Sequence, residues 1–102
     1  QVVEGSFGMF GGPKTWVRLL FESKAWRFLR RRQWHPSQQL VKTDQGVEMT
    51  MDVAGTIELK TWILGWGDQV EVIEPEQLRE EIVAELGRVV GKYGLKVSNT
   101  ND

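Results

Sequence analysis

The chain of 102 residues contains no cysteine and only one histidine, His35. The absence of cysteine excludes disulfide bonds, thiolate zinc sites and cysteine nucleophiles within this sequence. A single histidine leaves little material for acid–base catalysis or for a metal site, and no nucleophile is expected beside it. We therefore predict no catalytic residues, no metal site and no cofactor, and the composition argues against an enzyme.

Long apolar runs and an excess of charge of one sign are missing as well. No stretch of about 18 apolar residues occurs, so no transmembrane helix is predicted, and no signal-peptide pattern is visible. Thirteen basic and fourteen acidic residues give a formal net charge of −1. This balance argues against a globally basic nucleic-acid binder but allows a local basic patch. We expect a cytoplasmic protein without a membrane partner.

What is present fits a single globular domain, because 40% of the residues are hydrophobic and 26% are charged. Four glycines and a proline fall within residues 1–13, so this segment is predicted to be a linker from a preceding domain. Residues 14–94 form the expected domain, and the polar segment 95–102 is predicted to be a flexible tail. Because the chain begins with Gln1, we expect it to be a fragment of a longer protein.

Alternating apolar residues predict four strands, and apolar residues at helical spacing predict three helices. In chain order these elements are the strand 16–22, the helix 24–32, the strands 38–43 and 47–53, the helix 57–66, the strand 69–73 and the helix 75–93. Ser23 is expected to cap the first helix and Pro75 to begin the last one. The order is that of the ferredoxin-like split βαβ fold with an added helix. The expected class is therefore α+β, with both earlier helices on one face of a four-stranded antiparallel sheet.

The predicted hairpin determines which residues lie on the open face of that sheet. Asp44-Gln45-Gly46 is expected to form a three-residue loop, which pairs Thr43 with Val47. In this register Leu40 points away from the core. An exposed apolar strip is typical of an interface, and we predict a homodimer interface at such a strip, together with any uncovered part of the last helix. The residues of the strip are Trp16, Leu20, Leu40 and Ile73.

A basic cluster is the first candidate for binding. Within nine residues lie Lys24, Arg27, Arg30, Arg31 and Arg32, with no acidic residue among them. Guanidinium groups pair with phosphates, and an aromatic ring can stack on a base, so the pattern suits a nucleotide or a single strand. A solvated helix face would explain the same charges, and a role as a core or interface anchor is favoured for Trp34 over a role as a stacking platform. The candidate contacts of a nucleic-acid effector are Arg27, Arg30, Arg31, Arg32, Trp34, His35 and Gln38.

The segment Trp34-His35-Pro36-Ser37-Gln38-Gln39 and several others together resemble a known family. The other segments are Ser6-Phe7-Gly8, Val17-Arg18-Leu19-Leu20-Phe21, Trp62-Ile63-Leu64-Gly65-Trp66-Gly67, Val72-Ile73-Glu74-Pro75 and Leu78-Arg79-Glu80. As an ordered set they are similar to the C-terminal extension, or WCX domain, of the bacterial WYL-domain transcriptional regulators. The resemblance covers about residues 6–93.

This resemblance implies a ferredoxin-like regulatory accessory domain that contributes to dimer contacts and to an effector site. It also implies a DNA-binding helix-turn-helix and a WYL domain outside this chain, with a nucleic acid or a nucleotide as the effector. One alternative is an autonomous single-stranded nucleic-acid-binding module that uses the open sheet face. Trp16 would serve that role, whereas Glu48 and Asp52 would repel phosphate. A small-molecule-binding enzyme subdomain is disfavoured by the missing catalytic groups.

Overall fold

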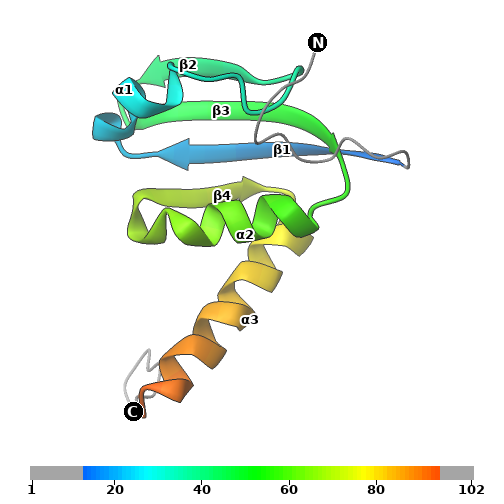
Figure 1. Cartoon of the computed structure of the whole chain (residues 1–102), viewed down its shortest axis with the longest axis vertical. Coiled ribbons are helices and arrows are strands. Elements are labelled where there is room, and N and C mark those ends of the chain that lie inside the picture. The colour runs from blue at the N-terminus through cyan, green and yellow to red at the C-terminus, as the bar shows by residue number, and fades with distance from the viewer. Residues whose placement is uncertain (1–12, 95–102) are drawn as a thin grey trace.

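The computed structural model describes residues 13–94. The predicted linker up to residue 12, the Ser6-Phe7-Gly8 segment and the predicted tail 95–102 lie outside the described residues. In chain order the elements are β1 (Lys14–Phe21), the 3₁₀ turn η1 (Ser23–Ala25), α1 (Trp26–Leu29), β2 (Gln39–Thr43), β3 (Gly46–Ala54), α2 (Ile57–Gly65), the 3₁₀ turn η2 (Gly67–Gln69), β4 (Val70–Glu74) and α3 (Glu76–Lys92) (Figure 1).

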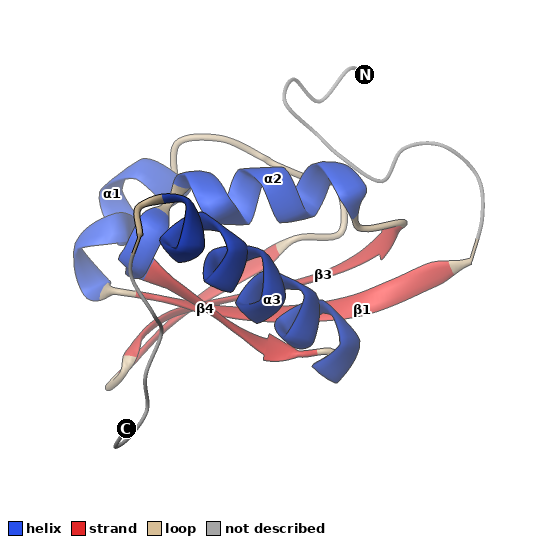
Figure 2. Ribbon diagram, turned by 90° about the horizontal axis from the view of Figure 1, so that it is seen from below, coloured by secondary structure: helices blue, strands red, loops and turns tan. Residues whose placement is uncertain are grey.

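The four strands form one antiparallel sheet in the order β2-β3-β1-β4. The central strands β3 and β1 are therefore not consecutive in the chain, which is the arrangement expected of a ferredoxin-like sheet. Figure 2 shows α1 and α2 on the same side of the sheet, and no helix of residues 13–94 covers the other side, which we call the open face. The predicted α+β class, the order of the elements and the helix-covered face are confirmed.

The core lies between the sheet and these helices. Alternate residues of the two central strands point into it, as their period of two predicts. Its buried members are Val17, Leu19, Phe21, Ala25, Leu29, Val47, Met49, Met51, Val53, Leu59, Ile63, Val72, Leu78 and Ile82. Phe21 packs edge-to-face on Trp62 and Trp66, with ring centroids 5.8 and 5.1 Å away. These rings extend the core towards the end of α2.

The hairpin between β2 and β3 is one residue tighter than predicted. Thr43 pairs with Gly46 rather than with Val47, which leaves Asp44 and Gln45 as a two-residue loop. A Cβ atom on Gly46 would lie 2.1 Å from the carbonyl oxygen of Phe21, and its φ of +144° also favours glycine. The strand therefore begins at this glycine, because only a residue without a side chain fits against β1 there.

This shift by one residue reverses the two faces of β2. Leu40 pairs with Met49 and packs against the core, whereas Val41 is half exposed on the open face. The prediction that Leu40 points away from the core is wrong. Its physical cause is the shorter loop, since every side chain of a strand changes face when the register moves by one residue.

The first helix is also shorter than predicted. The turn η1 leads into a single α-helical turn that ends at Leu29, with Arg30 as its C-cap. Ser23 lies inside the 3₁₀ turn and makes no capping hydrogen bond, so its predicted N-cap role is wrong. Ala25 and Leu29 are buried, but no apolar residue follows one turn later to extend the buried stripe. Arg31 and Arg32 consequently lie beyond the helix instead of in its last turn.

The longest described helix, α3, leaves the body of the domain (Figure 1). Leu78 and Ile82 in its first half are buried against the core, and no described residue of α3 after Ile82 is buried. Pro75 is the N-cap residue of this helix rather than its first residue. Among residues 13–94, none of the helices has the length and apolar character needed to cross a membrane.

Candidate functional site

The loop between α1 and β2 carries most of the predicted contact residues, and Gln38 holds it together. The Gln38 side-chain oxygen accepts a hydrogen bond from the Trp34 backbone N–H at 2.7 Å, and its amide nitrogen donates to the Arg32 carbonyl at 3.3 Å. Its own backbone N–H donates to the His35 carbonyl at 3.0 Å. Gln38 therefore shapes the loop from within rather than pointing at a ligand.

His35 and Ser37 together fasten the same loop to β3. Its Nδ1 accepts a hydrogen bond from the Ser37 N–H at 3.1 Å and lies 2.9 Å from the Ser37 hydroxyl. That hydroxyl accepts a bond from the Asp52 N–H at 2.8 Å. A hydroxyl thus stands beside the histidine, contrary to the expectation that no nucleophile accompanies it. Both side chains bond to backbone N–H groups, His35 to that of Ser37 and Ser37 to that of Asp52 in β3. The pair therefore stabilises the loop, and His35 has a structural role there.

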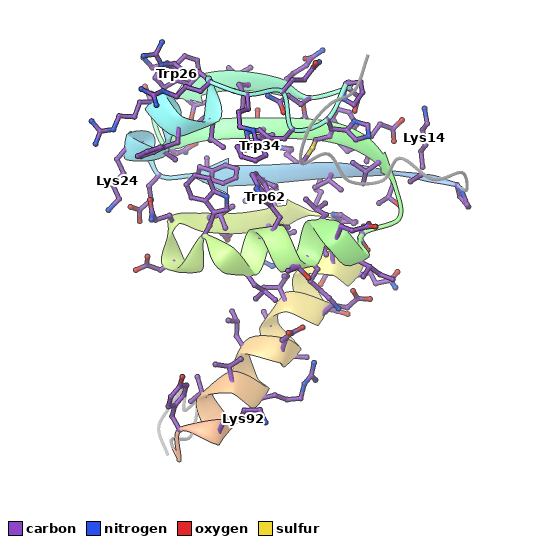
Figure 3. All side chains as sticks on the ribbon, viewed as in Figure 1. Lys14, Lys24, Trp26, Trp34, Trp62 and Lys92 are labelled. Atoms are coloured by element: carbon purple, nitrogen blue, oxygen red, sulfur yellow. The ribbon has the colours of Figure 1, made fainter. Side chains whose placement is uncertain are left out.

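Trp34 connects the loop to the core. Its ring centroid lies 5.1 Å from that of Trp62, which in turn contacts Trp66 edge-to-face at 5.9 Å. Figure 3 shows Trp34 and Trp62 next to each other on the covered side of the sheet. The Trp34 side chain is only partly buried. One part of the ring therefore belongs to the core cluster, and the rest remains on the surface.

A groove of about 560 Å³ opens beside this ring cluster. It separates the loop after α1 from the end of α2, and it combines aromatic rings with cationic side chains. Its lining residues are Phe28, Arg31, Arg32, Trp34, Gly65, Trp66 and Gln69. The Arg32 guanidinium carbon lies 4.4 Å from the centroid of the Trp34 ring, close enough for a cation–π contact. We call this feature the basic aromatic groove.

Two arginines, Arg31 and Arg32, line the groove, and no acidic residue is among its lining residues in the described part of the chain. Among residues 13–94, no carboxylate forms a salt bridge with Arg30 or Arg31. Arg27 stacks over the ring of Phe28 at 5.4 Å and so adds a further cation at the rim. Within the same described part of the chain, no group of three or more histidine, aspartate or glutamate residues could hold a metal ion. The groove can therefore bind a ligand by stacking on its aromatic rings and by pairing its arginines with anionic groups.

Comparison with protein families adds an independent observation. The family model of the WCX domain matches residues 13–90. The chain belongs to the WCX domain family. Among curated proteins, no sequence matches it. The family match agrees with the resemblance visible in the sequence, while the link to WYL regulators stays a prediction.

The WCX domain brings together three of the predicted effector contacts, Arg31, Arg32 and Trp34, in one groove. The other four have different positions. Arg27 lies at the rim and Arg30 on the surface, whereas His35 and Gln38 hold the loop. The predicted contacts therefore divide into groove residues and residues that give the groove its shape.

Four groove residues of the WCX domain were not among the predicted contacts, namely Phe28, Gly65, Trp66 and Gln69. An aromatic residue inside the predicted helix 24–32 suggests a core side chain, but Phe28 is 52% exposed. Trp66 ends the predicted helix 57–66 and Gln69 begins the predicted strand 69–73, and neither position indicates a groove. No local signal distinguishes Phe28, because Leu29 lies between the same two arginines and is fully buried.

The open sheet face of the WCX domain differs from the predicted apolar strip. Trp16 is exposed there, and Leu20 and Ile73 are half-buried, but Leu40 lies on the other face. Between the remaining apolar residues, Arg18 forms ion pairs with Glu48 and Glu74. Charged side chains therefore interrupt the strip. Leu40 is not part of the open face, so it cannot belong to a dimer interface there.

Proposed function

We propose that this WCX domain is the regulatory accessory module of a cytoplasmic, DNA-binding transcriptional regulator, in which it dimerises and helps to bind a nucleic-acid or nucleotide effector. Membership of the family supports the regulatory class. The observation that carries the ligand class is the basic aromatic groove, where Arg31 and Arg32 stand beside the rings of Phe28 and Trp34. The helix-turn-helix and the WYL domain of such a regulator would be parts of the protein outside this sequence.

The groove contains the two kinds of side chain that bind the two parts of a nucleotide, its phosphate and its base. An arginine fork binds two phosphate oxygens at once, and an exposed ring stacks on a base with about 1–3 kcal/mol per base. A volume of about 560 Å³ lies within the range of small-ligand sites. Because the groove is open on one side, a nucleotide within a longer strand would fit as well as a free one.

A second candidate function is an autonomous single-strand binder that uses the open sheet face. Trp16 is 53% exposed there and could stack on a base. However, the carboxylates of Glu48 and Glu74 pair with Arg18 in the middle of this face, and Asp52 adds a further negative charge. Carboxylates in these positions repel phosphates, so the basic aromatic groove is the better candidate.

The test is a titration of the whole 102-residue chain with a labelled oligothymidylate of about ten nucleotides, followed by fluorescence anisotropy at several salt concentrations. Engagement of three phosphates would give a log–log salt slope near −2, at about −0.7 per phosphate. Arg31→Ala should make this slope shallower by about 0.7. Lys14→Ala removes one positive charge from the far end of β1 and should leave the slope unchanged.

Two equally exposed aromatic residues separate the proposed function from its alternative. Phe28→Ala should weaken binding by about 1–3 kcal/mol without changing the salt slope. Trp16→Ala, the matched control on the open sheet face, should have no effect. The reverse result would favour the sheet-face binder. If neither Arg31→Ala nor Phe28→Ala changes the affinity, the groove is not a nucleic-acid site.

We also propose that the domain has no catalytic activity of its own. The Ser37 hydroxyl beside His35 accepts a hydrogen bond from the Asp52 N–H, and this bond holds the loop against β3. Assays with phosphoester, ester and nucleotide substrates should give no turnover. Turnover that is lost in both His35→Ala and Ser37→Ala, while the folded fraction stays unchanged by circular dichroism, would overturn this proposal.

A further inference from the structure

The stripe of apolar residues along α3 is covered only in its first half. Leu78 and Ile82 are buried against the core, and beyond them no other residue of the described range 13–94 buries the same side of the helix. Its uncovered members are Val83, Leu86, Val89 and Tyr93, with exposed fractions of 63%, 47%, 41% and 78%. Figure 1 shows this half of α3 projecting from the sheet. We call these four residues the α3 stripe.

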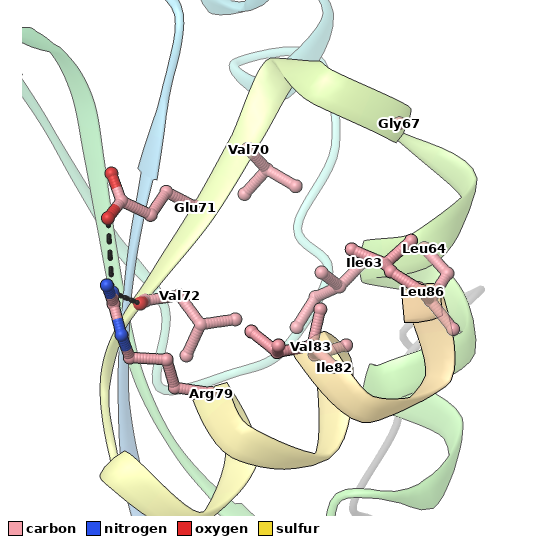
Figure 4. A pocket seen from close by; sticks show the side chains of 10 residues that line it. All are labelled: Ile63, Leu64, Gly67, Val70, Glu71, Val72, Arg79, Ile82, Val83 and Leu86. Atoms are coloured by element: carbon pink, nitrogen blue, oxygen red, sulfur yellow. Dashed lines mark hydrogen bonds and ion pairs between the residues drawn. The ribbon is translucent and has the colours of Figure 1, made fainter. Parts of the chain in front are cut away.

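The base of α3 is held firmly, which fixes the direction of the stripe. The guanidinium of Arg79 pairs with Glu71 at 3.1 Å and donates to the Val72 carbonyl oxygen at 2.7 Å. Figure 4 shows Arg79 reaching β4 in this way at the edge of a pocket of about 190 Å³. Ile63 and Leu64 of α2 line this pocket together with Val83 and Leu86. An apolar surface thus continues from the α3 stripe onto the body.

The charges along α3 are divided between its two halves. Residues 76–85 contain four glutamates and one arginine, whereas residues 86–92 contain Arg88 and Lys92 and no acidic residue. A second α3 that runs in the opposite direction would place its basic half beside the acidic half of the first. A parallel partner would place like charges together. The charge pattern of α3 therefore complements a reversed copy of itself.

We propose that α3 pairs antiparallel with α3 of a second copy of this chain. The α3 stripe of each copy then covers that of the other, and the Tyr93 end of each helix approaches the pocket of its partner. A two-fold axis perpendicular to the helices produces this contact, in which both copies use the same surface. The inference rests on the dimerisation part of the proposed function and assigns it to α3 instead of the open sheet face.

The expected dimer is of moderate strength. A 17-residue helix is about 26 Å long, so one helix pair buries less than the roughly 800 Å² per partner of a standard interface. We therefore expect dissociation at micromolar concentrations. Sedimentation equilibrium of the full chain, from low to high micromolar concentration, should show a monomer that converts to a dimer.

Leu86→Glu tests the stripe directly, because it places a charge in the apolar contact without touching the buried residues. The dimer dissociation constant should rise at least about tenfold, which corresponds to 1.4 kcal/mol. Ala84→Glu adds the same charge to an exposed residue on the other side of the same helix and should leave the constant unchanged. Circular dichroism shows whether both variants keep their fold.

The possible outcomes separate this inference from the proposed function. If Leu86→Glu still dimerises like the unmodified chain, α3 pairing is wrong, and a loss of dimer in Leu20→Glu would assign the interface to the open sheet face. Equal loss in Leu86→Glu and Ala84→Glu would also overturn the stripe contact. A chain that stays monomeric at every concentration would overturn both the inference and the proposed dimerisation. It would leave effector binding in the groove untouched, because the oligothymidylate titration tests that part separately.

Charge reversal tests the antiparallel direction. Replacing Arg88 and Lys92 by glutamate should weaken the dimer, because acidic groups would then face acidic groups. Adding Glu85→Lys to that variant should restore part of the lost affinity, because Glu85, unlike Glu81, forms no ion pair with another residue of the range 13–94. If the triple variant dimerises no better than the double variant, the two helices do not run antiparallel.

Discussion

Leu19 and Leu20 are identical side chains at adjacent positions of β1, yet they lie on opposite faces of the sheet. Leu19 is fully buried beneath the helices, whereas Leu20 is half-buried on the open face. On the covered face, apolar side chains hold the fold together. On the open face, the neighbours of Leu20 include the ion-paired Arg18 and Glu48. The comparison teaches that the two faces depend on different forces, the hydrophobic effect on one and screened electrostatics on the other.

Leu19→Ala is the change for which we expect the largest effect. It removes buried methyl groups and leaves a cavity, so the free energy of unfolding should fall by about 2–5 kcal/mol. Leu20→Ala makes the same chemical change on the open face and should cost less than about 1.5 kcal/mol. Urea denaturation followed by tryptophan fluorescence measures both losses. Equal losses would mean that the open face is covered in solution.

Gly46→Ala should have the next largest effect. The added Cβ would collide with the Phe21 carbonyl, and separating the strands to admit it should cost about 1–3 kcal/mol. Gly55→Ala is the control, because Gly55 also has a positive φ but has open space around it. Its cost should be limited to the backbone strain of about 1–2 kcal/mol. Thermal unfolding compares the two, and a larger loss for Gly55→Ala would contradict the proposed collision.

A smaller difference is expected between the neighbours Leu40 and Val41. Leu40→Ala removes a half-buried side chain from the core and should cost about 1–2 kcal/mol. Val41→Ala acts on the open face and should change the stability by no more than about 0.5 kcal/mol. The same urea measurement applies. A greater loss for Val41→Ala would support the three-residue loop over the observed register.

The pair Leu40 and Val41 also shows where sequence reasoning ends. The alternation in β3 and the apolar spacing of α2 and α3 depend on neighbouring residues, so these elements and the order of the fold could be predicted. The register of the hairpin, in contrast, changes when the loop is shorter by one residue. The backbone of Gly46 packs closely against the carbonyl group of Phe21, which lies far away in the sequence, and this packing favours the shorter loop. No local pattern contains that contact.

The candidate site divides in the same way. Arg31, Arg32 and Trp34 are close in sequence, and a basic segment with an adjacent ring could be recognised there. Trp66 and Gln69 reach the same groove from the end of α2, so only the folded chain shows that they belong to it. The length of α1 was overestimated because arginine has a high helix propensity, so residues 30–32 look like a continuation of the helix. Their side chains are exposed and add nothing to the buried face that stabilises α1.

The smallest expected effect concerns the ion pair on the open face. Arg18 of β1 and Glu48 of β3 are cross-strand neighbours, and both side chains retain contact with water. A double-mutant cycle with Arg18→Ala and Glu48→Ala should give a coupling energy of about 0.2–1 kcal/mol, as for other exposed pairs. Because salt screens exposed charges, the coupling should shrink when the ionic strength is raised to about 1 M. The loss caused by Leu19→Ala should change little under the same conditions, since burial of apolar surface does not depend on charge. A coupling that is insensitive to salt would show that the pair is shielded from water, and the contrast between the two faces would then be wrong.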